Sequence, residues 1–206
     1  DCISDLRTVL LINKSKTGFI LSDSPAVSSN KLISKRFMKY RNWGLGSAGF
    51  YVFMPLTPQL GFFAFDRQVY DLANCNGFKC NINSSDVAAL NQLVYLLSDK
   101  LIVLPPNADP QTLLSGLKKV AASKPARMMR LNIAVKDKVQ KQIGRSRFSV
   151  ATDEEFASSK EGFLHVESVP PIIPTHLPKL RIRQSPKFID TKSGGGLRRS
   201  GAKWSI

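Results

Sequence analysis

Residues 84–99 would be apolar on almost every side if they formed a helix, and this feature constrains the fold more than any other. The apolar positions repeat at the three- and four-residue spacing of one helical face: Val87, Leu90, Val94 and Leu97. We expect Ser84 or Ser85 to cap the helix, and Asp86 in its first turn favours the positive end of the helix dipole. Such a helix must be covered, so we expect it to pack across a sheet.

Strands for that sheet are predicted in two apolar, aromatic-rich segments, residues 49–54 and 60–66, joined by the turn Pro55-Leu56-Thr57-Pro58-Gln59. Residues 8–13 and 18–21 are predicted to form two further strands, connected by a polar segment of hairpin length. Shorter strands are expected at 68–72, 100–104, 131–135 and 162–166. The strand at 68–72 would extend an antiparallel meander.

A second helix is predicted to begin at Asp109, because Asp is a good N-cap and Pro110 suits the first helical turn. Its apolar positions lie along one side: Leu113, Leu114, Leu117 and Val120. The sequence therefore predicts an α+β domain over residues 1–122, with an antiparallel or mixed sheet backed by the two helices. A basic and then acidic region, residues 123–169, is expected to follow. Residues 170–206 are expected to be a proline-rich, extended connector with a flexible basic tail.

Positive charge is concentrated in the second half of the chain. Residues 111–206 hold 19 Lys and Arg against 7 Asp and Glu, whereas residues 1–110 hold 11 against 8, and the formal net charge is +15. This excess predicts an anionic partner, nucleic acid or another polyanion, bound mainly through phosphates. In the alternative, the acidic block within residues 148–178 folds back on its basic neighbours. No motif of a sequence-specific nucleic-acid reader occurs.

The residues expected to contact the polyanion come from the second half and from a helper segment, residues 30–43. In the second half they are Lys118, Lys119, Lys124, Arg127, Arg130, Lys136, Lys138, Lys141, Arg145, Arg147, Arg181, Arg183, Arg198 and Arg199. In the helper segment they are Lys35, Arg36, Lys39 and Arg41. Aromatic residues alternate with the basic residues of the helper segment, and their rings would stack on exposed bases. Alternatively, residues 30–43 are an ordinary surface segment whose aromatic rings point inward.

The cysteines, Cys2, Cys75 and Cys80, are few and odd in number, which favours thiols in a reducing compartment and a cytoplasmic protein. Asn76-Gly77 is a turn signature, so Cys75 and Cys80 could approach one another across a loop. Both histidines lie far from these cysteines, so we predict no metal site, and we expect no cofactor. No apolar run approaches the roughly 20 residues that a membrane-spanning helix needs.

Three polar residues are candidates for a catalytic site. Ser22 and Asp23 lie in Ser22-Asp23-Ser24-Pro25, where short polar side chains can bond backbone N–H groups of a turn. The turn also follows a predicted strand, which is a common place for a working carboxylate. Asn91 lies on the apolar stripe of the first helix, where an unpaired amide would destabilise the fold by about 1–3 kcal/mol. We expect turn backbone to be its partner, with a ligand contact as the alternative.

Three motifs in this order resemble the bacterial DUF4238 family: Ser22-Asp23-Ser24-Pro25, Pro55-Leu56-Thr57-Pro58 and Leu90-Asn91. The resemblance covers residues 8–105 and corresponds to the second half of the family pattern. The usual His-Tyr-Val-Pro opening of the family is missing, as expected of an N-terminally truncated or divergent member. The family has no established activity, so the resemblance implies a shared fold. If its polar motif residues form a site, Ser22, Asp23 and Asn91 are the positions that carry over.

The sequence favours a non-enzymatic protein that binds nucleic acid or another polyanion. The first alternative is an enzyme, a hydrolase or nuclease acting at Asp23 and Asn91, although no convincing general-base histidine or nucleophile motif supports it. The second alternative is a structural component of a nucleoprotein or protein assembly, in which residues 111–206 become ordered on a protein partner.

Overall fold

The computed structural model describes residues 5–35, 44–73, 75–106, 108–122, 124, 128–136, 148–150, 154, 157, 162–169, 177–190 and 196–198. The chain forms two compact units. The first contains residues 1–125 and 172–206, and the second contains residues 126–171.

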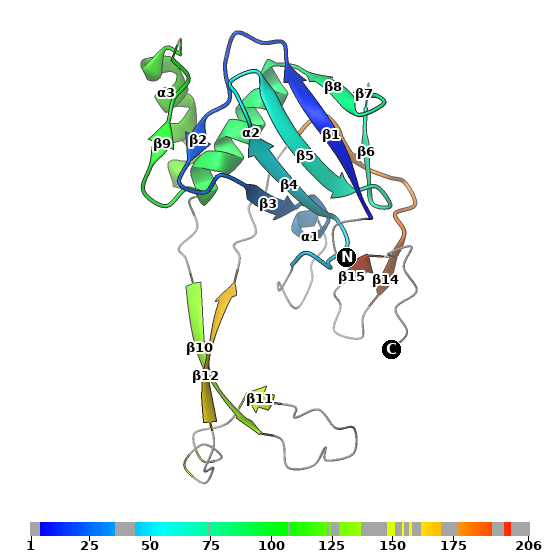
Figure 1. The fold of residues 1–206 in the computed structure, drawn as a ribbon, viewed down its shortest axis with the longest axis vertical. Coiled ribbons are helices and arrows are strands. Elements are labelled where there is room, and N and C mark those ends of the chain that lie inside the picture. Colours follow the sequence, from blue (N-terminus) through cyan, green and yellow to red (C-terminus); the bar gives the residue numbers. More distant parts are fainter. Residues whose placement is uncertain are drawn as a thin grey trace. The chain divides into compact units, whose positions relative to one another are not determined.

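A six-stranded mixed sheet is the centre of the first unit (Figure 1). Its strands are β3 (Val27–Asn30), β4 (Phe50–Pro55), β5 (Leu60–Asp66), β1 (Leu6–Asn13), β8 (Lys79–Ile82) and β7 (Cys75–Asn76), in that spatial order. Neighbouring strands are antiparallel except β1 and β8, which run parallel. The predicted α+β class with a mixed sheet is confirmed.

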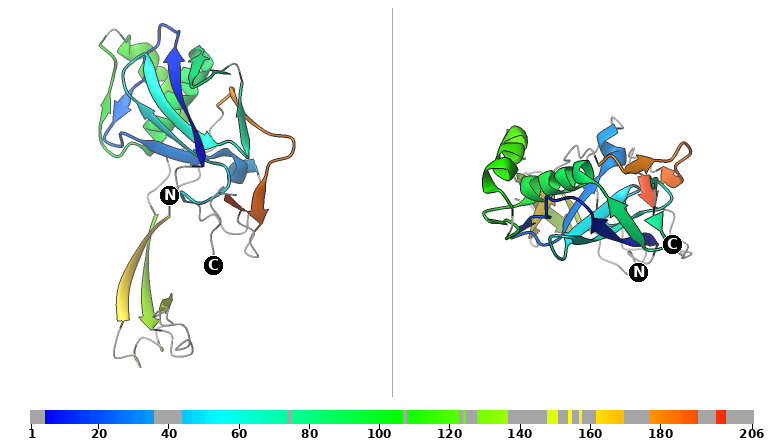
Figure 2. Two further views of the ribbon diagram at one scale, coloured as in Figure 1. Left: turned by 45° about the vertical axis from the view of Figure 1, so that its right-hand side comes forward. Right: turned by 90° about the horizontal axis from the view of Figure 1, so that it is seen from above.

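Helix α2 (Ser84–Leu97) lies along one face of this sheet, as the view from above shows (Figure 2). Its apolar side chains share one buried core with the aromatic residues of β4 and β5, which include Phe53, Phe63 and Phe65. Helix α3 (Pro110–Ala121) contacts α2 and adds Leu117 to the core. Because the sheet and α3 both contact α2, the helix carries buried apolar residues on more than one side.

The cap of α2 differs from the prediction. Asn83, one residue before the predicted serines, is the N-cap: its side chain accepts a hydrogen bond from the Asp86 N–H, and Asp86 accepts one from the Asn83 N–H. This reciprocal capping box satisfies two backbone donors together, whereas a serine cap would satisfy one. The predicted cap of α3 is confirmed, since Asp109 accepts hydrogen bonds from the Gln111 and Thr112 N–H groups.

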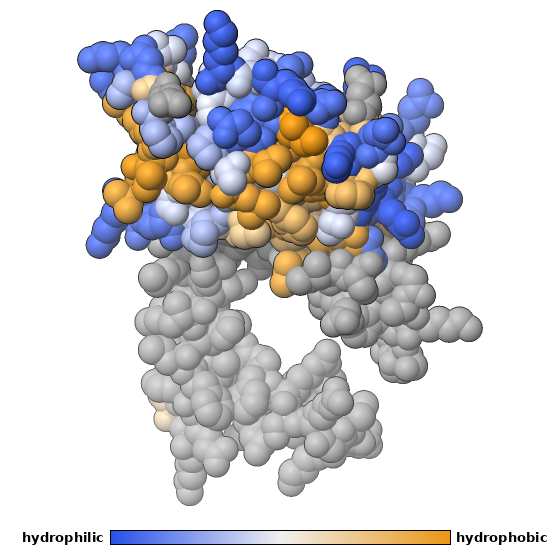
Figure 3. All heavy atoms as spheres, turned by 45° about the horizontal axis from the view of Figure 1, so that its top comes forward, coloured by the Kyte–Doolittle hydropathy of each residue, from blue (hydrophilic) through white to orange (hydrophobic). Residues whose placement is uncertain are grey.

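The predicted hairpin of residues 8–13 and 18–21 is wrong. Residues 18–20 do not pair with β1 as a strand; they run beside the β4–β5 turn, where the Phe19 N–H donates to the Pro58 carbonyl at 2.9 Å. The chain continues into β2 (Leu21–Ser22), which pairs with β9 (Ile102–Val103) in a small ribbon. Leu21, Leu101 and Val103 are exposed large apolar residues. Figure 3 shows a face of the molecule on which apolar residues form a band between hydrophilic areas.

The segment of residues 177–190 packs on the first unit, although the sequence predicts an extended connector there. Its strand β13 (Leu180–Ile182) pairs with β6 (Tyr70–Leu72), so β6 does not extend the meander as expected. Leu177 and Leu180 are buried in the core, which explains why this proline-rich segment is held in place. Strand β14 (Phe188–Asp190) then pairs with β15 (Gly196–Arg198), within the predicted flexible tail.

The second unit contains a three-stranded antiparallel sheet of β11 (Phe148–Val150), β10 (Met128–Lys136) and β12 (Gly162–Val169). The predicted strands at 131–135 and 162–166 are confirmed, and both are longer than expected. A short helix, α1 (Lys31–Lys35), follows β3 in the first unit.

Cys75 and Cys80 form a disulfide across the β7–β8 hairpin, so the expectation of two thiols is wrong. The two residues face one another in the strand register, with their Cα atoms 4.3 Å apart, which brings the side chains within bonding reach. Free thiols were the ground for predicting a cytoplasmic location, which therefore stays an untested prediction.

Among the described residues, no helix is long and apolar enough to span a membrane. The same part of the chain contains no cluster of three or more potential metal ligands.

Candidate functional site

Asp23 is bound to the backbone of the turn that follows α2. Its carboxylate accepts hydrogen bonds from the N–H groups of Asp99 (2.8 Å), Lys100 (2.7 Å) and Leu101 (3.4 Å). These bonds, above all those from Asp99 and Lys100, lower the pKa of Asp23 below its ordinary value, so the side chain stays ionised. All three hydrogen bonds are made to the protein's own backbone, and we call this arrangement the Asp23 clamp.

Ser22 and Asn91 also bond to nearby backbone. The Ser22 hydroxyl donates to the Ser24 carbonyl at 3.0 Å and accepts from the Ser24 N–H at 3.1 Å. Asn91, only 2% exposed, donates to the Gly18 carbonyl at 2.9 Å and accepts from the Ile20 N–H at 3.1 Å. The expectation that Asn91 binds turn backbone is confirmed. Asn91 and Asp23 thus fasten segment 18–24 to α2 and to the turn after it, whereas Ser22 bonds within the segment itself.

A different group of side chains surrounds a cleft of about 550 Å³ on the first unit. The described residues that line it are Arg7, Arg67, Gln68, Arg183, Ser185 and Lys187. Four of the six are Lys or Arg, and none is Asp or Glu. We call the cleft that these six residues line the cationic cleft.

Three parts of the chain build the cationic cleft. Arg7 comes from β1, Arg67 and Gln68 from the turn between β5 and β6, and the other three residues from the segment after β13. Backbone hydrogen bonds hold that segment against the turn: the Arg183 N–H donates to the Val69 carbonyl (2.9 Å) and the Lys187 N–H to the Gln68 carbonyl (3.1 Å). The arrangement is therefore set by strand-like pairing between parts of the chain more than 100 residues apart.

The turn between β5 and β6 is itself shaped by Asp66. This buried carboxylate accepts hydrogen bonds from the Gln68 N–H and the Gly49 N–H, both at 2.9 Å. Arg183 adds a side-chain contact, because its Nε donates to the carbonyls of Arg67 (2.9 Å) and Tyr70 (3.0 Å). The Nε of Arg183 is thus already hydrogen-bonded within the protein.

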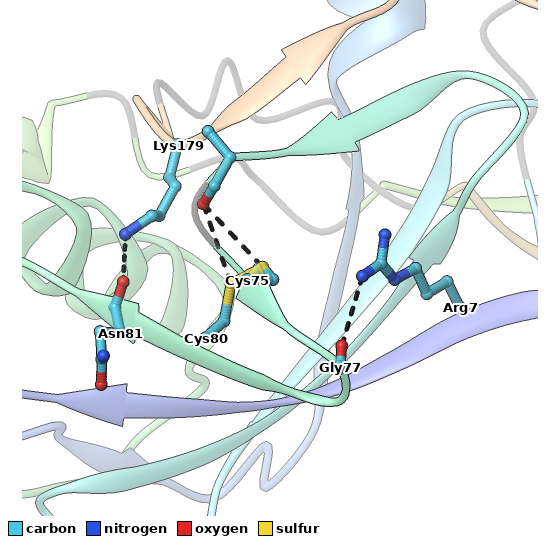
Figure 4. Close-up of a disulfide and its surroundings, with 7 residues drawn as sticks. Arg7, Cys75, Gly77, Cys80, Asn81 and Lys179 are labelled. Carbon is cyan, nitrogen blue, oxygen red and sulfur yellow. Dashed lines mark hydrogen bonds between the residues drawn. A yellow bond between two sulfur atoms is a disulfide. The ribbon is translucent and has the colours of Figure 1, made fainter.

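Arg7 lies beside the disulfide hairpin (Figure 4). One terminal nitrogen donates to the Gly77 carbonyl at 3.3 Å, and the guanidinium carbon lies 6.0 Å from the centre of the Phe65 ring. Both contacts limit where the guanidinium can lie without neutralising its charge.

Little negative charge within the described structure offsets these cations. Arg183 lies 3.6 Å from the Asp71 carboxylate, and both side chains are substantially exposed, so the pair is weak. Arg7, Arg67 and Lys187 have no carboxylate within 4.0 Å among the described residues. An anion entering the cleft would meet at least three cations that no described carboxylate neutralises.

The predicted polyanion contacts are only partly brought together. Arg183 lines the cationic cleft, Arg181 is exposed on β13, and Lys118 and Lys119 are exposed on α3. Lys124 has an internal role, because its ammonium donates to the Ser98 hydroxyl and lies 5.1 Å from the centre of the Tyr95 ring.

The structure does not describe the side chains of the other predicted contacts. Lys35, Arg130, Lys136 and Arg198 lie in described helices or strands, with side chains outside the description. The remaining positions lie outside the described residues: Arg36, Lys39, Arg41, Arg127, Lys138, Lys141, Arg145, Arg147 and Arg199. Sequence reasoning missed Arg7, Arg67 and Lys187 as individual contacts. Only the excess of basic residues over residues 111–206 pointed toward Lys187.

One comparison with known proteins gives a match. The family described as "Protein of unknown function (DUF4238)" matches residues 1–107, which confirms the resemblance seen in the turn and helix motifs. No curated protein and no solved structure matches the chain.

Proposed function

Because the chain belongs to the DUF4238 family, whose function is unknown, we propose from the site alone that the protein binds nucleic acid or another polyanion through phosphate contacts, without catalysis. The observation that carries this proposal is the cationic cleft, where four Lys and Arg residues share one opening and no lining residue is acidic. Catalysis is not proposed, because Ser22, Asp23 and Asn91 are bonded to backbone and do not line this cleft.

The side chains of the cleft suit phosphate. Three of its four cations are arginines, whose planar guanidinium groups can present two parallel N–H donors to the oxygens of a phosphate. Gln68 and Ser185 add neutral polar groups beside them. A phosphate group would therefore find both charge and directed donors.

The lining also argues for recognition of the backbone of a nucleic acid and not of its bases. None of the described lining residues is aromatic, so the cleft has no platform on which bases stack. Contacts to phosphates position a nucleic acid but carry no sequence information. We expect single-stranded nucleic acid and inorganic polyphosphate to compete for the same cleft.

The test is the salt dependence of binding by a variant with two cleft charges removed. Arg67→Gln with Lys187→Gln leaves Arg7 and Arg183, whose side chains contact neighbouring backbone, in place. Binding of a fluorescein-labelled oligothymidylate is followed by anisotropy between roughly 50 and 200 mM salt. If both cations contact phosphates, the slope of log affinity against log salt should fall by about 1 to 2.

Lys14→Gln with Lys100→Gln is the matched control. Both lysines are exposed and lie outside the lining of the cleft, and the variant loses the same formal charge. We expect its salt slope to stay near that of the wild type. Equal losses in the two variants would show that overall charge, and not the cleft, attracts the polyanion. Absence of wild-type binding at low salt would reject the proposed function itself.

A further inference from the structure

A second cleft, of about 390 Å³, lies between α2 and α3, and Lys16 and Thr17 of the loop after β1 also line it. It shares no described lining residue with the cationic cleft. Leu113 and Leu117 contribute apolar surface, and most of the lining is apolar. Its volume falls in the range of roughly 300–1,000 Å³ that is typical of small-molecule sites.

Gly116 indicates that this space is not a packing defect. It lies inside α3, where glycine is the least favourable residue apart from proline. Apart from its chain neighbours and the backbone of its own helix, a Cβ atom at this position would meet no atom within 4 Å, and Gly116 is not among the glycines with positive φ. Neither close packing nor backbone conformation therefore requires glycine, and its effect is to keep the wall of the cleft open.

The polar groups at the rim differ in how far they are already bonded. The Gln92 amide is half-buried and the Lys16 ammonium is exposed, and neither has a partner in the part of the chain that the structure describes. Asp109, by contrast, accepts hydrogen bonds from the Gln111 N–H, the Thr112 N–H and the Thr112 hydroxyl. The rim thus offers a cation and an amide to a ligand, while its carboxylate is hydrogen-bonded to its own helix and stays ionised, because those bonds, above all the one from the Thr112 hydroxyl, lower the pKa of Asp109.

From these features we infer that the cleft binds a small molecule with an apolar body and a carboxylate head. The body lies against Leu113, Leu117 and the open face of Gly116, and the head is directed to Lys16 and Gln92. A polyanion does not suit this cleft, because most of its lining is apolar and Lys16 is the single cation among the described lining residues. The inference is independent of the proposed function, since the two clefts are lined by different residues.

The test follows octanoate binding to the ¹⁵N-labelled 206-residue chain by NMR. We expect saturable shifts of the Gly116 backbone amide and the Gln92 side-chain amide at millimolar concentration. Gly116→Leu should abolish these shifts, because the leucine side chain would occupy the open space of the cleft. The rest of the spectrum should remain that of a folded protein. Gly116→Ala, which adds one methyl group, should still bind and tests whether substitution alone disturbs α3.

The role of the head group is tested with a pair of neighbouring lysines. Lys16→Gln should weaken octanoate binding about two- to fivefold, as expected for an exposed ion pair. Lys14→Gln in the same loop should not, because Lys14 does not line the cleft. Binding of 1-octanol should be equal in all three proteins. Absence of saturable shifts, their persistence in Gly116→Leu, or equal effects of the two lysine variants would each overturn the inference.

Discussion

Single polar side chains hold distant backbone segments together in this protein. Asn91 joins α2 to residues 18 and 20, and Asp23 joins the end of the same segment to residues 99–101. Both are more than 60 residues away in sequence from the backbone groups they bind. Residues 18–23 make little regular sheet structure, so these side chains replace the bonds that a longer strand would have made.

Replacing Asn91 with Ala should therefore destabilise the fold strongly. The substitution leaves the Gly18 carbonyl and the Ile20 N–H buried without their partner, and it removes side-chain packing. We expect the free energy of unfolding to fall by about 2 to 4 kcal/mol, measured by urea denaturation. A loss below about 1 kcal/mol would mean that water replaces the amide and that Asn91 is not a structural clamp.

The Asp23 clamp should make stability depend on pH in the acidic range. Its pKa is lowered in the folded state, mainly by the Asp99 N–H, so the ionised form favours folding. This stabilisation is complete above the unfolded pKa of about 4 and is lost as pH falls through the lower folded value. The stability difference between wild type and Asp23→Asn should thus shrink below about pH 4. A difference that stays constant across this range would contradict the role of the charge.

At the scale of elements, the start of α2 provides a direct test of the capping box. Asn83→Ala removes the side chain that accepts from the Asp86 N–H, and we expect a loss of about 1 kcal/mol in unfolding free energy. Ser84→Ala changes the neighbouring residue, one of the two serines that the sequence suggested as the cap, and should alter stability by less than about 0.5 kcal/mol. Thermal unfolding of the two variants decides between the two positions, since a larger loss in Ser84→Ala would reverse the assignment.

Local signals predicted the elements better than their pairing. The helix at residues 84–97, the α3 cap at Asp109 and the strands β4 and β5 follow from periodicity and turn residues within a short window. The parallel pairing of β1 with β8 and the pairing of β6 with β13 join segments far apart in sequence. No window contains both partners, so these contacts were not predicted.

The same limit applies to the candidate site. Arg183 was predicted because basic residues are dense around it, whereas Arg7 and Arg67 stand alone in a first half with little net charge. They reach the cationic cleft because β1, the β5–β6 turn and the segment after β13 meet there. Asn91 was correctly expected to bind turn backbone, since a buried amide on an apolar stripe requires a partner.

At the scale of the whole molecule, one segment contributes to both the core and the site. Residues 177–187 place Leu177 and Leu180 in the core and Arg183 and Lys187 at the cationic cleft. The segment is anchored from two directions: the Lys31 ammonium donates to the Leu180 carbonyl at 2.6 Å, and the Lys179 N–H donates to Asp86 at 3.0 Å. Stability and polyanion binding should consequently be coupled through this segment.

Leu180→Ala tests that coupling. Leu180 is fully buried, so the substitution leaves a cavity and should lower the unfolding free energy by about 2 to 5 kcal/mol. Because it also loosens the segment that carries Arg183 and Lys187, oligothymidylate binding should weaken even under conditions where the variant remains folded. Leu114→Ala makes the same chemical change at an exposed position on α3, and it should alter stability by less than about 1 kcal/mol and leave binding unchanged. If Leu180→Ala destabilised the protein without weakening polyanion binding, the segment would support the core alone, and the cations of the cleft would be positioned independently of it.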